Sequence, residues 1–67
     1  MHVMVLGNAS RPGVQEEADQ LLPFLRSHAD IVAFDLQQKE DLSNIRADLA
    51  LVLGGDGAIL RAARQMG

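Results

Sequence analysis

The feature that most constrains the fold is an apolar run that leads directly into a glycine cluster and then into a segment with helical spacing. Residues 49–53 (LALVL) precede Gly54, Gly55, Asp56 and Gly57, and helical periodicity follows over residues 58–66. An apolar run bounded by turn-forming residues predicts a strand, here over residues 48–53, whereas the unalternating run at residues 3–6 is typical of a strand buried on both faces. The glycines allow the backbone to approach a ligand closely, and the start of a helix favours anions. These residues therefore predict a strand–loop–helix unit that binds a phosphate-bearing ligand.

Asp56 is an unexpected residue in a phosphate-binding loop, because a carboxylate and a phosphate repel each other. Its presence is explained if it acts on something beside the phosphate, such as a hydroxyl group or a metal ion. The alternative is that its carboxylate only caps the following helix. The three surrounding glycines favour the first interpretation, so Asp56 is the candidate catalytic residue.

The rest of the chain alternates strands and helices. Residues 3–6 (VMVL) and 30–35 (DIVAFD) predict two further strands, and the apolar spacing of residues 14–25 predicts a helix between them. Pro23 interrupts this helix, and we expect a bend there or a break into two short helices. Residues 36–47 are polar and predict at most one helical turn, near residues 42–45. The fold class is therefore α/β, a three-stranded parallel sheet with flanking helices and right-handed crossovers.

The final helix is expected to have one apolar side and one polar side. The polar side is predicted to hold Arg61, Arg64 and Gln65, and the apolar side Ile59, Ala62, Ala63 and Met66. Two helices can hardly cover both faces of three parallel strands. We therefore expect the chain to be a piece of a larger protein or to be completed by another chain.

Composition excludes several functional classes. The chain has 67 residues, a net charge of −3 and no basic cluster, which argues against nucleic acid as a partner. It has no cysteine, which excludes disulfides and thiolate metal sites. His2 and His28 have no partners at ligand spacing, so no metal site is expected. No signal peptide or membrane span is recognisable, and a cytoplasmic location without membrane contact is the expectation.

Three common phosphate-binding motifs do not fit. A Walker A loop ends in Gly-Lys-Ser/Thr, and neither glycine-containing loop has that lysine. A dinucleotide fingerprint needs a third glycine, which is missing in the stretch from residue 55 onward. A receiver-type phosphoacceptor needs an acidic pair after the first strand, where this chain has Gly7 and Asn8.

The stretch LVLGGDGAILRAAR (residues 51–64) resembles the NAD kinase family, in which a strand leads into GGDG and a helix reading close to LLRAAR. GGDG alone is shared with diacylglycerol and sphingoid-lipid kinases and with phosphofructokinases, and the extension through Arg64 narrows the resemblance to NAD kinases. The family usually has threonine after GGDG, where this chain has Ala58. This difference removes a hydroxyl that could cap the helix or contact phosphate.

The resemblance implies transfer of the γ-phosphoryl group of ATP to the 2′-hydroxyl of the adenosine ribose of NAD, which yields NADP. ATP with a divalent cation such as Mg²⁺, and NAD as substrate, are the implied small-molecule partners. Asp56 would orient the hydroxyl and accept its proton, as a positioned carboxylate does in other kinases. The implied cofactor-binding residues are Gly54, Gly55, Asp56, Gly57 and Arg61.

The resemblance also bears on domain organisation. It implies that residues 1–67 are the N-terminal part of an α/β nucleotide-binding domain, because the family's C-terminal β-rich domain, which holds most of the NAD, is absent here. The chain alone is then expected to be inactive, and the full-length protein to form a homo-oligomer.

Two other functions stay open. One is a lipid kinase of the same GGDG superfamily, and the other is a small binding or assembly module that holds nucleotide without turnover. Asn8 and Arg11 follow the first strand, where a turn is the favoured interpretation and a phosphate contact the alternative. Asp35 ends the second strand, and a role in holding a ribose is a weaker hypothesis.

Overall fold

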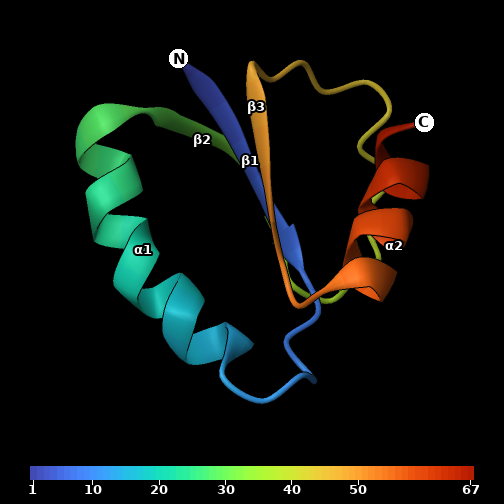
Figure 1. The fold of residues 1–67 in the computed structure, drawn as a ribbon. Helices are drawn as coiled ribbons and strands as arrows, with labels where there is room; N and C mark the ends of the chain where they lie inside the picture. Colours follow the sequence, from blue (N-terminus) through green and yellow to red (C-terminus); the bar gives the residue numbers. More distant parts are fainter.

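A computed structural model describes all 67 residues and confirms the α/β class (Figure 1). Its three strands form one parallel sheet, and the two helices lie on opposite faces of that sheet. In chain order the elements are β1 (His2–Gly7), α1 (Val14–His28), β2 (Asp30–Asp35), β3 (Leu49–Leu53) and α2 (Asp56–Met66).

The first strand lies at the centre of the sheet, whose order is β2-β1-β3. It is the most completely buried strand, and Val3, Val5 and Leu6 are almost completely buried. Gly7 ends this strand where β3 comes very close. A Cβ atom on Gly7 would lie 2.5 Å from the carbonyl oxygen of Leu53, so a side chain here would push the two strands apart. Glycine is therefore required for the pairing that brings the ends of β1 and β3 together.

Each helix packs on its own apolar cluster. On the α2 face, Ala62 packs with Met4 and Leu6 of β1 and with Leu42. On the α1 face, Val14 and Ala18 pack with Leu36, next to the partly buried Leu53. The core therefore consists of two thin aliphatic layers, one on each side of the central strand.

The helices differ from the expectations in two respects. Of the bend or break expected at Pro23, the break is absent, because α1 is one continuous helix and Pro23 lies on its exposed side. Helix α2 begins at Asp56 rather than at Ala58, so only Gly54 and Gly55 form the bend. Ala58 is consequently buried in the first turn and is not the cap position.

The buried side of α2 also differs from the expected one. It consists of Ala58, Ala62 and Gln65, whereas Ile59 and Leu60 are 54% and 68% exposed. The small alanines let the helix approach the sheet closely, and Gln65 is buried because it has a polar partner in the sheet. The outer side of α2 is therefore largely apolar and exposed.

Residues 36–48 connect β2 to β3 along the α2 face of the sheet (Figure 1). The single turn expected here is present, because the Ile45 amide donates to the Leu42 carbonyl oxygen at 3.1 Å. Asp41 accepts hydrogen bonds from the hydroxyl and the backbone amide of Ser43, and both lower the pKa of Asp41. Neither helix has the length and apolar character that a membrane span requires.

Candidate functional site

Three loops meet at the carboxyl edge of the sheet, the lower edge in Figure 1. The loop after β1 is held to the other two strands by the backbone amides of Asn8 and Ala9. They donate to the carbonyl oxygens of Leu53 at 3.1 Å and of Leu36 at 2.9 Å. Ligands of open parallel sheets bind at this edge. An open hollow of about 270 Å³ lies here, lined by Asn8, Arg11, Gln38, Gly54, Asp56, Gly57, Ala58 and Arg61.

The glycine bend has a backbone that only glycine adopts readily. Gly54 has φ 125° and Gly55 has φ 113°, both outside the range of ordinary L-residues. A Cβ atom on Gly54 would contact Ala58 at 3.4 Å and Asn8 at 3.6 Å. Gly55 is the N-cap of α2 and lies beside the Arg11 guanidinium, which would be 3.7 Å from a Cβ atom there. The bend thus turns β3 sharply into α2 and leaves its backbone uncovered.

Asp56 is the first residue of α2 and its side chain is exposed. It does not cap the helix, because no side-chain hydrogen bond is made at this helix start. The capping alternative is therefore not the arrangement found. A negative charge in the first turn of a helix is favoured by the helix dipole. Asp56 lines the hollow and makes no hydrogen bond within the chain.

Two arginines from different elements line the same hollow. Arg11 comes from the loop after β1, and Arg61 comes from α2 one turn beyond Gly57. The one ion pair of the structure joins His2 and Asp30 at 4.0 Å, so neither arginine is neutralised by a carboxylate. Arg64 lies further along and lines a neighbouring hollow with Lys39 and Arg61. The site therefore offers two free guanidinium groups around one free carboxylate.

Asn8 forms a turn, as the sequence favoured, and also lines the hollow. Its Oδ1 atom accepts hydrogen bonds from the backbone amide of Ser10 at 3.0 Å and from the Ser10 hydroxyl. The same loop carries Arg11, which lines the hollow as well. Turn formation and a place at the site are thus compatible.

Asp35 has a role that sequence reasoning missed. Its carboxylate is buried at the end of β2 and accepts four hydrogen bonds. Three come from the backbone amides of Gln37, Lys39 and Glu40, and the fourth from the Gln65 side chain. The ribose-binding hypothesis for Asp35 was wrong, since both of its oxygens are occupied within the chain. Burial raises the pKa of Asp35, but the four hydrogen bonds together outweigh burial and lower it.

Gln38 is a second residue that sequence reasoning did not single out. It lies in the loop folded around Asp35, is half-buried, and lines the hollow together with Asp56. Its φ of 60° is the one positive value at a residue other than glycine. No short-range pattern could have revealed it, because its position depends on a carboxylate bound by distant groups.

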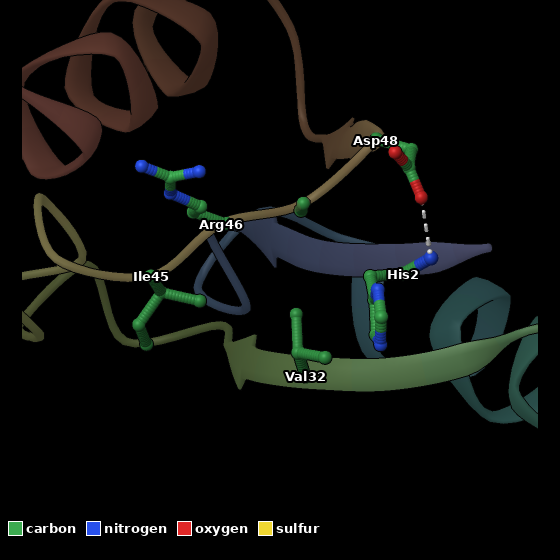
Figure 2. Close-up of a pocket in the computed structure, with 6 residues that line it drawn as sticks. His2, Val32, Ile45, Arg46 and Asp48 are labelled. Atoms are coloured by element: carbon green, nitrogen blue, oxygen red, sulfur yellow. Dashed lines mark hydrogen bonds between the residues drawn. The ribbon is translucent and has the colours of Figure 1, made fainter.

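The largest hollow of the molecule, about 760 Å³, lies at the opposite end of the strands. Figure 2 shows the side chains of Val32 and Ile45 facing this gap, while the Arg46 guanidinium points away from them. The backbone amide of His2 donates to Asp48 at 2.8 Å, which ties the starts of β1 and β3 together. None of the candidate site residues lines this hollow, which is an open area between the 45–48 segment and β2.

Comparison with known proteins finds a relative, a NAD kinase. The chain is 42% identical over 65 residues to a NAD kinase of Rhodopirellula baltica, and the match covers 97% of this chain. The predicted resemblance to NAD kinases is confirmed. The NAD kinase match covers 21% of the length of that relative, so the chain spans about a fifth of it. No family model matches the chain, and no solved structure matches it either.

Proposed function

We propose that this chain supplies the phosphoryl-transfer part of a NAD kinase site, in which ATP phosphorylates the 2′-hydroxyl of NAD to give NADP. The observation that carries the proposal is the free carboxylate of Asp56, exposed beside two unpaired arginines at the carboxyl edge of the sheet. The identity to a NAD kinase over 97% of the chain supports it independently.

In the proposed reaction the 2′-oxygen of the adenosine ribose attacks the γ-phosphorus of ATP. The new bond joins that oxygen to phosphorus, the bond between phosphorus and the β,γ-bridging oxygen breaks, and ADP leaves. The hydroxyl proton passes to the carboxylate of Asp56, which also orients the hydroxyl. Because the transition state is loose, alignment of the two oxygens contributes more than the strength of the base.

The residues around Asp56 can stabilise the negative charge on the phosphates during phosphoryl transfer. Gly54, Gly55 and Gly57 leave backbone uncovered, so phosphate oxygens can approach the amides at the start of α2. Arg11 and Arg61 would offset the repulsion between Asp56 and the phosphates, since no acidic partner occupies either guanidinium. Repulsion is also reduced because the hydroxyl, and not the phosphate, is the partner of Asp56.

The chain's residues fit a divalent cation that arrives with the nucleotide. No group of three or more His, Asp or Glu side chains gathers at one place, and Asp56 is the one carboxylate that lines the hollow. Mg²⁺ is commonly held by one or two carboxylates together with substrate phosphates and waters, which is compatible with this arrangement. Such an ion would neutralise the phosphate charge, and Asp56 is the residue available to contact it.

The 67-residue chain by itself is proposed to be inactive. The hollow of about 270 Å³ is smaller than the roughly 300–1,000 Å³ that sites for drug-sized ligands occupy, and two nucleotides must be held at once. The rest of the NAD would be bound by residues outside this chain. A homo-oligomer in the cytoplasm is proposed, and the exposed Ile59 and Leu60 on the outer side of α2 support the self-association.

The test is the formation of NADP by the protein as it is encoded. We expect NADP to accumulate from NAD and ATP, with no phosphorylation of diacylglycerol offered in mixed micelles at the same concentration. Phosphorylated lipid without NADP would favour the lipid kinase alternative. Tight ATP binding with neither product would favour a nucleotide-binding module and contradict the proposal.

A further inference from the structure

We propose that Gln38 contacts the nucleoside part of the bound nucleotide and that Asp35 positions it there. This inference rests on the proposed function, because it names a further residue for the same site. Residues 36–40 form the third loop at the carboxyl edge. The GGDG motif and the resemblance of the chain to kinases assign no role to this loop. Gln38 is the residue of this loop that lines the hollow beside Asp56.

The loop that carries Gln38 is built around one buried carboxylate. Asp35 Oδ1 accepts the amide of Gln37 at 2.8 Å, and Oδ2 accepts the amides of Lys39 at 2.9 Å and Glu40 at 2.8 Å. The residues on both sides of Gln38 are therefore fixed by charge-assisted hydrogen bonds, which are stronger than neutral ones. Gln38 itself donates no hydrogen bond to Asp35, and it lines the hollow.

The same carboxylate fixes the loop to the helix that carries Asp56. Gln65 Nε2, near the end of α2, donates to Asp35 Oδ2 at 2.8 Å and to the Glu40 carbonyl oxygen at 3.0 Å. The backbone carbonyl oxygen of Gln65 accepts from Leu42 at 2.8 Å. Because α2 begins at Asp56 and ends beside Asp35, these bonds set the position of the loop relative to the catalytic residue.

The backbone of Gln38 has a conformation that costs free energy. Its φ of 60° lies in the left-handed region, which residues other than Gly, Asn and Asp seldom adopt. Such strain persists where the surroundings impose it, and it is concentrated at functional sites. In this loop the Asp35 hydrogen bonds impose it. An asparagine or glycine would fit the backbone better, so the longer glutamine is explained by what its side chain reaches.

The chemistry of the side chain indicates the part of the ligand. A neutral amide donates and accepts hydrogen bonds, which suits ribose hydroxyls and the edge of a base. No hydrogen bond within the chain uses the Gln38 amide, whereas its neighbours are engaged through their backbones. Arg11 and Arg61 already supply positive charge for phosphates. Gln38 is therefore assigned to the uncharged nucleoside part.

The experiment compares Gln38→Gly with Gln37→Ala in the protein as encoded, with ATP, NAD and inorganic triphosphate as titrants. Gln38→Gly removes the amide and accepts the positive φ, so the thermal midpoint should not fall. Loss of one neutral hydrogen bond predicts ATP or NAD affinity weaker by about three- to tenfold, with triphosphate affinity unchanged. In Gln37→Ala the backbone hydrogen bond to Asp35 is kept, so this variant should bind ATP, NAD and triphosphate with the affinities of the parent protein. Unchanged affinity for both nucleotides, or an equal loss for triphosphate, would overturn the proposal.

A double-mutant cycle tests whether Asp35 acts through Gln38. Asp35→Asn alone should weaken nucleotide binding, but in the Gln38→Gly background it should add less than a twofold further loss, because the contact is already absent. Fully additive losses would show that Asp35 only stabilises the fold. NADP formation by the parent protein is measured separately. If the parent protein forms no NADP but Gln38→Gly still weakens nucleotide binding, the proposed reaction is contradicted and the nucleoside contact of Gln38 is supported.

Discussion

Asp56 and Asp35 are two carboxylates that the fold places in opposite surroundings. Asp56 is exposed and unbonded within the chain, whereas Asp35 is 6% exposed and accepts four hydrogen bonds. The place of Asp56 was predictable, because the glycines that create its setting are its sequence neighbours. The role of Asp35 was not, because one of its partners is 30 residues away and three are backbone amides. Sequence patterns reveal local settings and miss those that tertiary contacts create.

The glycines of the bend allow a prediction at the residue scale. Gly54→Ala forces an alanine to φ 125° and should lower the free energy of unfolding by about 1–3 kcal/mol. Gly57→Ala is the matched control, because Gly57 lies inside α2 and a Cβ atom there would meet nothing within 4 Å. It should stabilise the chain by up to about 1 kcal/mol. Chemical denaturation measures both, and a destabilised Gly57→Ala would contradict the structure.

The same control variant also separates folding from binding. If Gly57 is present so that phosphate can lie against the backbone, Gly57→Ala should weaken ATP binding by about tenfold, equivalent to about 1.4 kcal/mol. Calorimetric titration with ATP measures this. Undiminished ATP affinity in a stabilised Gly57→Ala protein would remove Gly57 from the cofactor-binding residues.

At the scale of elements, the strands were the most predictable part. Each predicted strand is present within one residue at either end, because short runs rich in apolar and β-branched residues, bounded by turn-forming residues, are typical of strands. The helices were less predictable in detail. Pro23 does not break α1, since losing one hydrogen bond on the exposed side is tolerated in a helix of 15 residues that is packed on the sheet. The prediction of which side of α2 faces the sheet was wrong, because Gln65 is polar and yet buried.

Asp35 links β2, the loop after it and α2, and acid should weaken that link. Its pKa is lowered in the folded chain, so folding is favoured by its ionised form and this contribution is complete above the unfolded pKa of about 3.9. The contribution should be lost as the pH falls from about 4 through the lowered pKa. Unfolding free energies between pH 6 and pH 2 test this. Asp35→Asn should be less stable by about 1–3 kcal/mol at pH 7 and show a shallower acid decline. An equal loss of unfolding free energy in acid for the parent protein and for Asp35→Asn would contradict this role of Asp35.

At the scale of the whole molecule, apolar surface is the most prominent unexplained feature. Ile59 and Leu60 on α2 are exposed, and so are Phe34 and Leu49 on the two edge strands. Two helices leave a three-stranded sheet only partly covered, as its sequence indicated. Apolar surface of this kind is typical of protein–protein contacts. The proposed homo-oligomer would place a second copy of the protein over the outer side of α2.

This proposed contact predicts that Ile59→Ser combined with Leu60→Gln lowers the mass in solution. Both side chains point away from the sheet, so the fold and the affinity for ATP should be unchanged. Sedimentation over a range of concentrations measures the mass, and Gln20→Ser on the exposed side of α1 serves as the surface control. A parent protein and double variant of equal mass at every concentration would contradict self-association through α2.

The most direct test of the whole account is the turnover number of Asp56→Asn compared with its affinity for substrates. The variant keeps the size of the side chain, and Asp56 makes no hydrogen bond within the chain, so folding should be unaffected. We expect kcat for NADP formation to fall by about 10²–10⁴-fold, with the Kd values of ATP and NAD within about threefold of the parent. Glu16→Gln, which removes an exposed carboxylate from the first turn of α1, should be fully active. A kcat for Asp56→Asn within a few-fold of the parent would contradict the proposed role of its carboxylate.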